Sequence, residues 1–218
     1  MRMRREGISA MSFLSDAAEY LFFPSAGRCP YCGDENGNGA VCAKCSRELE
    51  GLLIRDAGSS GISKYAHAGI ARSMVLRLKF EGRTNLARVI ARELADLVPG
   101  DVDIITFVPL HPLRQRARGY NQSELIAKEL AGILDIPCRC LLIRIKNTPK
   151  QSTRQSVFER EHNLRNAFAP AFGQSASGKN ILLVDDVITT GATVRECSKQ
   201  LLKSKPASVR AISFTAAR

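Results

Sequence analysis

The sequence ILLVDDVITTGAT, from Ile181 to Thr193, joins an unbroken apolar run to an acidic pair and a polar loop. The run Ile181–Val184 shows no alternation of polar and apolar residues, which predicts a central parallel strand covered on both faces. Asp185 and Asp186 follow at its carboxyl end, where open α/β sheets bind ligands. A helix is expected from Val194 to Lys203. The stretch therefore predicts a ligand site between a buried strand and a helix.

The loop between this strand and helix suits a phosphate group. Its residues are Thr189, Thr190, Gly191, Ala192 and Thr193. Glycine lets a ligand approach the backbone closely, and hydroxyls and amides at a helix start bind anions. The acidic pair would repel a phosphate unless it held hydroxyls or a cation. A ribose 5-phosphate meets both demands; the alternative is an ordinary strand-turn-helix with a threonine-rich N-cap.

Composition places the chain among globular proteins of one main domain with a small satellite. It has 218 residues, 44% of them hydrophobic and 24% charged, and a net charge of +11. This charge favours phosphate-rich partners, either a nucleotide-like substrate or nucleic acid, although scattered positive residues also fit a solvated surface. Tryptophan is absent, so stacking platforms for single strands are not evident. No stretch is long enough for a transmembrane span.

The N-terminal region resembles a secretory signal only superficially. Residues 8–23 are apolar on one side but are interrupted by polar and acidic residues, which predicts an amphipathic helix. We therefore expect a cytoplasmic protein, which starts at Met1 or Met11.

Four of the seven cysteines form two matched C-x2-C pairs: Cys29, Cys32, Cys42 and Cys45. An odd total argues against a secreted disulfide framework. Four thiolates in two such turns can close a tetrahedral zinc site, so the pattern predicts a small structural zinc finger. Redox dithiols or unrelated free thiols are the alternatives.

The region after the cysteines predicts mainly helices. Helices are expected at residues 46–54, 70–80 and 85–97, with a short strand at 63–68. Lys79, at the end of the second of these helices, fits either a solvated face or a contact to a phosphate.

A second strand and an arginine-rich loop follow. The strand is expected at Val102–Val108, and the loop, from Pro109 to Gln122, precedes a helix at 123–134 and a strand at 137–145, which makes one βαβ unit. The loop carries His111, Arg114, Arg116 and Arg118. Arginine forks match phosphate oxygens, although an RNA-binding or solvated loop also fits.

A long polar segment at 146–163 lies between two expected strands. An active-site lid, including Arg154, is one interpretation, since closure excludes water; a disordered loop is the other. Strands are expected at 166–172 and at 209–215, the latter closing the sheet.

The motifs together resemble a known family. The order VPLHPxRxxxRGYNQ, KxTxxQ and LLVDDVxTTGAT, behind CPxCG and CxxC, is similar to the ComF/GntX family of phosphoribosyltransferase-like competence proteins, from about Phe23 to the C-terminus. The resemblance implies an α/β fold of the type I phosphoribosyltransferase kind: a mostly parallel central sheet flanked by helices, with a small N-terminal zinc finger of four cysteines. We expect the finger in residues 1–48, a hood-like helical segment in 49–100 and the core in 101–218.

The resemblance also implies roles for these residues. Asp185 and Asp186 would hold the ribose hydroxyls of phosphoribosyl pyrophosphate. The 189–193 loop would bind its 5-phosphate, and Mg²⁺ together with the arginine-rich loop would bind its pyrophosphate. Lys79 and Arg154 are further contact candidates. The family implies a link to uptake or use of external DNA, with DNA and competence helicase-type proteins as partners. A glutamine amidophosphoribosyltransferase is not expected, because no glutaminase domain is present. A non-catalytic module that keeps the site and binds DNA or a competence partner is the alternative.

Overall fold

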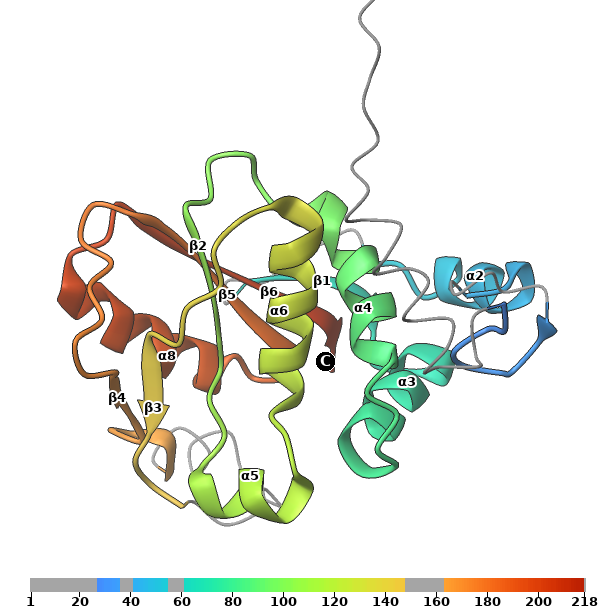
Figure 1. Ribbon diagram of the computed structural model, residues 1–218, viewed down its shortest axis with the longest axis horizontal. Helices are drawn as coiled ribbons and strands as arrows, with labels where there is room; N and C mark the ends of the chain where they lie inside the picture. Colours follow the sequence, from blue (N-terminus) through green and yellow to red (C-terminus); the bar gives the residue numbers. More distant parts are fainter. Residues whose placement is uncertain (1–26, 36–40, 55–60, 148–162, 218) are drawn as a thin grey trace, which may run out of the picture. The chain divides into compact units, whose positions relative to one another are not determined.

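The central sheet consists of four parallel strands in the order β1-β6-β5-β2 (Figure 1). The computed structural model describes residues 27–35, 41–54, 61–147 and 163–217. Two compact units divide the chain, Met1–Ser46 and Arg47–Arg218, and the sheet belongs to the second. The strands are β1 (Ile62–Ala66), β2 (Ile104–Phe107), β5 (Asn180–Ile188) and β6 (Ser208–Ala216).

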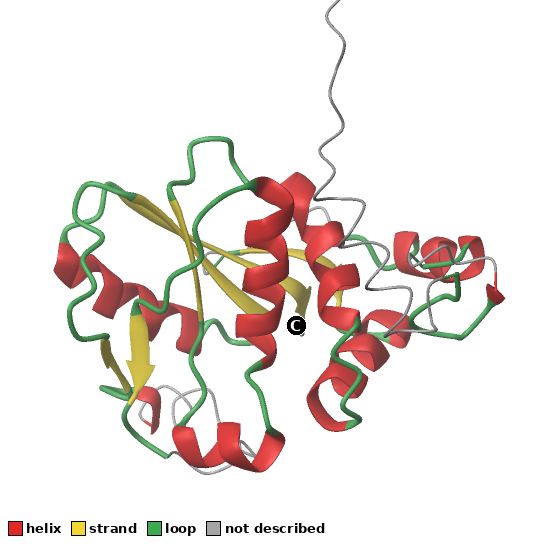
Figure 2. Cartoon of the chain, viewed as in Figure 1, coloured by secondary structure: helices red, strands yellow, loops and turns green. Residues whose placement is uncertain are grey.

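Helices cover the sheet on both faces (Figure 2). Helices α4 and α6 pack on each other and against β6, β5 and β2, while α8 packs against β5. The helices are α2 (Ala43–Glu50), α3 (Gly69–Phe80), α4 (Leu86–Leu94), α5 (Pro112–Arg118), α6 (Gln122–Leu134) and α8 (Ala192–Leu201), with short 3-10 turns at Ala95–Leu97 and Leu202–Ser204. None of the described helices is both long and apolar enough to span a bilayer.

The apolar run in β5 forms the middle of the core, as its lack of alternation predicts. Each of its residues, Ile181–Val184, is fully buried. Ile181 and Leu183 pack in one cluster with Cys197 of α8. Because successive strand residues point to opposite faces, Leu182 and Val184 face the helices on the other side of the sheet. The prediction of a parallel strand covered on both faces is confirmed.

Two predictions about the sheet are wrong. The strand expected at 137–145 meets β2 only at the bridge Ile105–Cys138; β3 (Leu142–Arg144) then pairs antiparallel with β4 (Phe168–Pro170) in a separate two-stranded sheet. At this bridge the N–H of Ile105 donates to the carbonyl of Pro137 at 3.0 Å and the N–H of Arg139 donates to the carbonyl of Ile105 at 2.9 Å. The strand expected to close the sheet is β6, which lies inside it, and β1 takes the edge.

Two further predictions about local structure need correction. The acidic pair does not follow the strand but lies within it, since β5 continues to Ile188. The arginine-rich segment is not wholly a loop, because α5 forms at Pro112–Arg118. Proline at the first helical position has a suitable φ, and Gly119, at φ 88°, ends the helix in the left-handed region.

Two predicted segments lie outside the described residues: the amphipathic helix at 8–23, and residues 148–162 of the expected lid with Arg154. The expected hood-like role of residues 49–100 stays a prediction.

Candidate active site and metal centre

The two adjacent carboxylates of β5 are both buried, and each has a different partner. Ser123, in the first turn of α6, donates from Oγ to Oδ1 of Asp185 at 3.0 Å, and the backbone N–H of Asp186 donates to the same oxygen at 2.9 Å. Burial, and then the charge of Asp186, raises the pKa of Asp185 to about 7. The pair is therefore held in place where its charge is poorly solvated, which favours binding of a cation or of hydroxyl donors.

Lys79 supplies the counterion of Asp186. Its Nζ lies 2.6 Å from Oδ2 of Asp186, whose side chain is only 4% exposed. That oxygen has no hydrogen-bond partner among the described residues, so the ion pair is its compensating contact. Lys79, which the sequence analysis gave as a possible phosphate contact, thus lies against the acidic pair.

The last turn of α3 connects this ion pair to the arginine-rich segment. The hydroxyl of Tyr120 donates to the carbonyl of Leu78, next to Lys79. The guanidinium of Arg118 lies over the ring of Phe80, 5.4 Å from its centroid, and also donates to Gln122. Residues 78–80 therefore contact both the acidic pair and the end of α5.

The other predicted contacts of the arginine-rich segment lie on α5. His111 caps this helix, because its Nδ1 accepts from the N–H of Leu113 at 3.3 Å. Arg114 is half-buried, whereas Arg116 is exposed. Burial lowers the pKa of Arg118 overall, while the charge of Asp186 acts in the opposite direction, so this arginine lies within electrostatic range of the acidic pair.

The polar loop after β5 leads directly into α8. Gly191 is buried and adopts φ 74°, in the left-handed region that favours glycine. Thr190 accepts at Oγ1 from the N–H of Ala192 at 3.4 Å, and its carbonyl accepts from Arg195 at 2.8 Å. Thr189 is exposed and Thr193 is half-buried. The loop therefore presents hydroxyls and a helix N-terminus immediately after the strand that carries the acidic pair.

His67 is a further candidate residue that the sequence analysis did not single out. It follows β1, and its Nδ1 and Oγ1 of Thr215 lie 2.8 Å apart. Burial, and then the charges of Lys79 and Arg72, lower the pKa of His67. Its place near the carboxyl end of the strand expected at 63–68 was the available signal, because the carboxyl ends of parallel strands share one edge of the sheet.

The four predicted zinc ligands converge in the first unit. Their sulfur atoms, in Cys29, Cys32, Cys42 and Cys45, all lie within 4.8 Å of one another, and the thiols are free. Burial acts to raise the pKa of the Cys29 thiol, but hydrogen bonds from three backbone groups lower it to about 7 overall. Four convergent cysteine sulfurs, three of them buried, fit a closed structural zinc site.

The comparisons with known proteins agree with this arrangement. Residues 121–218 match the model of the phosphoribosyl transferase domain. The chain is 32% identical over 199 residues to competence protein ComFC of Bacillus subtilis, covering 87% of this chain and 77% of that protein. It is 38% identical to competence protein F of Haemophilus influenzae, over 60% of this chain and 61% of that protein. It is 31% identical to the DNA utilization protein YhgH of Salmonella typhi, over 84% of this chain and 81% of that protein. The chain therefore belongs to the ComF/GntX family, with a type I phosphoribosyltransferase fold and an N-terminal four-cysteine cluster.

Proposed function

We propose that the protein binds phosphoribosyl pyrophosphate together with Mg²⁺ and transfers the phosphoribosyl group to a nitrogen acceptor. The observation that carries this proposal is the buried acidic pair near the carboxyl end of β5, a strand that leads into a loop in which Gly191 caps α8. Carboxylates suit the ribose diol, and helix N–H groups suit the 5-phosphate. One strand end thus offers both halves of ribose 5-phosphate a matching partner.

The carboxylates fit a magnesium ion as well as a diol. Mg²⁺ prefers oxygen ligands and usually keeps several waters beside one or two carboxylates. Oδ2 of Asp186 is buried and accepts no hydrogen bond among the described residues, so it is the first candidate ligand, with Asp185 beside it; Mg²⁺ would take the place that the Lys79 ammonium holds. A bound Mg²⁺ would neutralise charge on the pyrophosphate. Ser123 would keep Asp185 oriented towards the ribose hydroxyls.

The arginines of α5 are assigned to the pyrophosphate. Arg118 lies within the electrostatic range of the acidic pair, and Arg114 and Arg116 lie on the same short helix. In the reaction, the bond from C1 to the pyrophosphate oxygen breaks and its electron pair leaves with pyrophosphate. The lone pair of the acceptor nitrogen forms the new bond, and the acceptor's proton passes to solvent. Stabilising the departing charge would be the main contribution of the arginines, while the acidic pair would stabilise the cation-like sugar.

Calorimetric titration with phosphoribosyl pyrophosphate, with and without Mg²⁺, tests the binding step. We expect Mg²⁺-dependent binding by the wild type and its loss in the double variant Asp185→Asn, Asp186→Asn, which keeps side-chain size but removes two charges. An exposed control, Asp135→Asn, should bind normally. Equal binding by wild type and double variant would contradict the proposal.

A screen of nitrogen bases for pyrophosphate release separates catalysis from binding. Release that depends on one acceptor supports the transferase. Binding without release from any acceptor would favour a non-catalytic module that uses the ligand as a signal. The link to DNA use is tested in cells: we expect the double variant to lose transformation or DNA-use efficiency while its DNA affinity, measured at fixed salt, is undiminished. Normal DNA use without sugar binding would rule out this function as the physiological one.

A further inference from the structure

Lys79 extends from a helix end that its neighbours hold in place. The carbonyl of Leu78 accepts a hydrogen bond from the hydroxyl of Tyr120, and Leu78 is fully buried. On the other side, the ring centroid of Phe80 lies 5.4 Å from the guanidinium carbon of Arg118. The backbone on both sides of Lys79 is therefore anchored, and its flexible four-carbon stem is the part that can change partner.

This stem lies close both to a carboxylate and to the arginine-rich segment. Its ammonium is 2.6 Å from Oδ2 of Asp186, and the lysine side chain is 21% exposed. Arg118 lies within electrostatic range of the same carboxylate, because the charge of Asp186 acts on the pKa of this arginine. A phosphate held by Arg118 would therefore come close to the Lys79 ammonium.

Mg²⁺ and the Lys79 ammonium compete for one oxygen atom. Oδ2 of Asp186 is buried and accepts no hydrogen bond within the described part of the chain, which makes it the first candidate ligand for the metal. Two cations on this oxygen would repel each other strongly, since buried charges are poorly screened. Binding of Mg²⁺ therefore displaces the ammonium, and a partly buried ammonium without a counterion is costly.

We infer that Lys79 exchanges partners: its ammonium pairs with Asp186 when no metal occupies that carboxylate, and it binds the pyrophosphate of the ligand when Mg²⁺ is bound there. This inference rests on the proposed function. Either ligand alone leaves one member of the ion pair without a counterion, whereas the two ligands together satisfy both members. Each ligand therefore strengthens the binding of the other by the same factor, so Lys79 makes pyrophosphate recognition depend on the metal.

Calorimetric titration with Mg²⁺ alone measures the competition for Asp186. Lys79→Met lacks the competing ammonium, so it should bind Mg²⁺ about tenfold more tightly than the wild type. Lys79→Arg keeps the positive charge and should bind Mg²⁺ like the wild type. Lys128→Met is the matched control, because Lys128 pairs with the carboxylate of Glu124 at the surface. Equal Mg²⁺ affinity of Lys79→Met and the wild type would overturn the inference.

Titration with inorganic pyrophosphate in the absence of metal tests the second partner. Asp186→Asn releases the ammonium and leaves it charged, so this variant should bind pyrophosphate about tenfold more tightly than the wild type. The double variant Lys79→Met, Asp186→Asn contains neither buried charge, so it should fold, and it should lose the gain. A gain that persists in the double variant would come from the weaker negative field alone and would overturn the inference, as would the absence of a gain.

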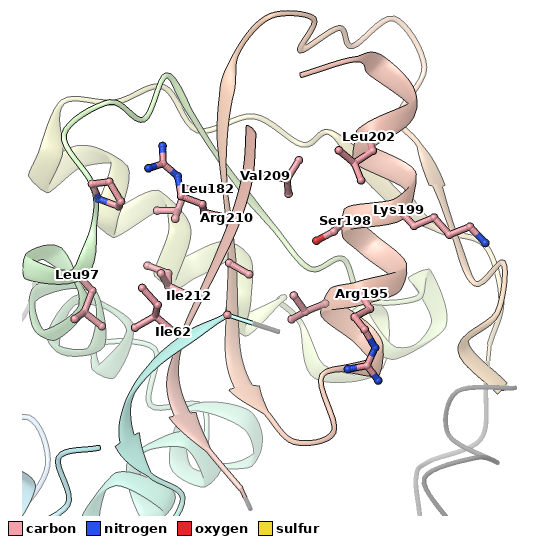
Figure 3. Close-up of a pocket in the computed structure, with 14 residues that line it drawn as sticks. Ile62, Leu97, Leu182, Arg195, Ser198, Lys199, Leu202, Val209, Arg210 and Ile212 are labelled. Carbon is pink, nitrogen blue, oxygen red and sulfur yellow. The ribbon is translucent and has the colours of Figure 1, made fainter. Parts of the chain in front are cut away.

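A lysine elsewhere on the surface controls for the loss of positive charge. Lys199 of α8 lines a cavity of about 430 Å³ to which neither Lys79 nor the acidic pair contributes. Figure 3 shows its side chain pointing outward from α8, away from the strands. Lys199→Met, combined with Asp186→Asn, should therefore keep the gain in pyrophosphate affinity. Loss of the gain in this control would show a general effect of charge and would overturn the inference.

Titration with pyrophosphate and with phosphoribosyl pyrophosphate at equal free Mg²⁺ separates this inference from the proposed function. The wild type should bind both ligands about tenfold more tightly than Lys79→Met does. Binding that is the same in the two proteins would overturn only the exchange of partners. Failure of the wild type to bind either ligand with Mg²⁺ would overturn both the exchange and the proposed function.

Discussion

Replacing Lys79 by methionine removes the counterion of Asp186 while keeping a side chain of similar length. The ammonium lies 2.6 Å from a carboxylate that is 4% exposed, and the lysine side chain is itself 21% exposed. Removing one partner of a buried ion pair costs about 3–5 kcal/mol, because the remaining charge is uncompensated. We therefore expect Lys79→Met to lower the free energy of unfolding by about 3 kcal/mol at neutral pH, the lower end of this range, because the lysine side chain is partly solvated.

Urea denaturation at neutral pH, followed by circular dichroism, measures this loss. Lys128→Met is the control. Lys128 forms an exposed ion pair with Glu124, one helical turn away, at a distance of 2.7 Å. Such pairs contribute only about 0.3–0.5 kcal/mol to the free energy of unfolding. Mg²⁺ should restore more stability to Lys79→Met than to the wild type, since it can replace the missing charge. Equal losses of stability in the two lysine variants would show that the buried ion pair contributes no more than the exposed one and would contradict this prediction.

Three other outcomes are expected. The folded protein raises the pKa of Asp185 to about 7, so ionisation of this carboxyl destabilises the fold as the pH rises from about 4 to about 7. In thermal denaturation, Asp185→Asn should therefore be more stable than the wild type at about pH 8, and this advantage should disappear near pH 4. Gly191→Val should abolish phosphoribosyl pyrophosphate binding in calorimetry, whereas Gly173→Val, which imposes similar strain at φ 72° with open space around it, should not. Metal analysis should find about one zinc per chain in the wild type and in Cys140→Ser, but less in Cys42→Ser; metal-free wild type with a folded first unit would contradict the zinc assignment.

The sequence pattern was sufficient to predict those structural features that a single short segment of the chain forms. The apolar run Ile181–Val184 reads as a buried strand without knowledge of its neighbours, because a strand covered on both faces needs no polar side. The convergence of the paired cysteines likewise follows from two short turns. The α5 helix was missed although Pro112 and Gly119 carry its signals, because the arginines between them were interpreted only as ligand contacts.

The acidic pair, the loop that follows it and the cysteine cluster could be identified from the sequence, since each depends on residues close together in the chain. Tertiary packing was needed to show that Lys79 neutralises Asp186, that Ser123 orients Asp185 and that β6 lies inside the sheet. These features depend on the order in which parallel strands assemble. That order is set by the packing of the helical crossovers, which no local periodicity encodes.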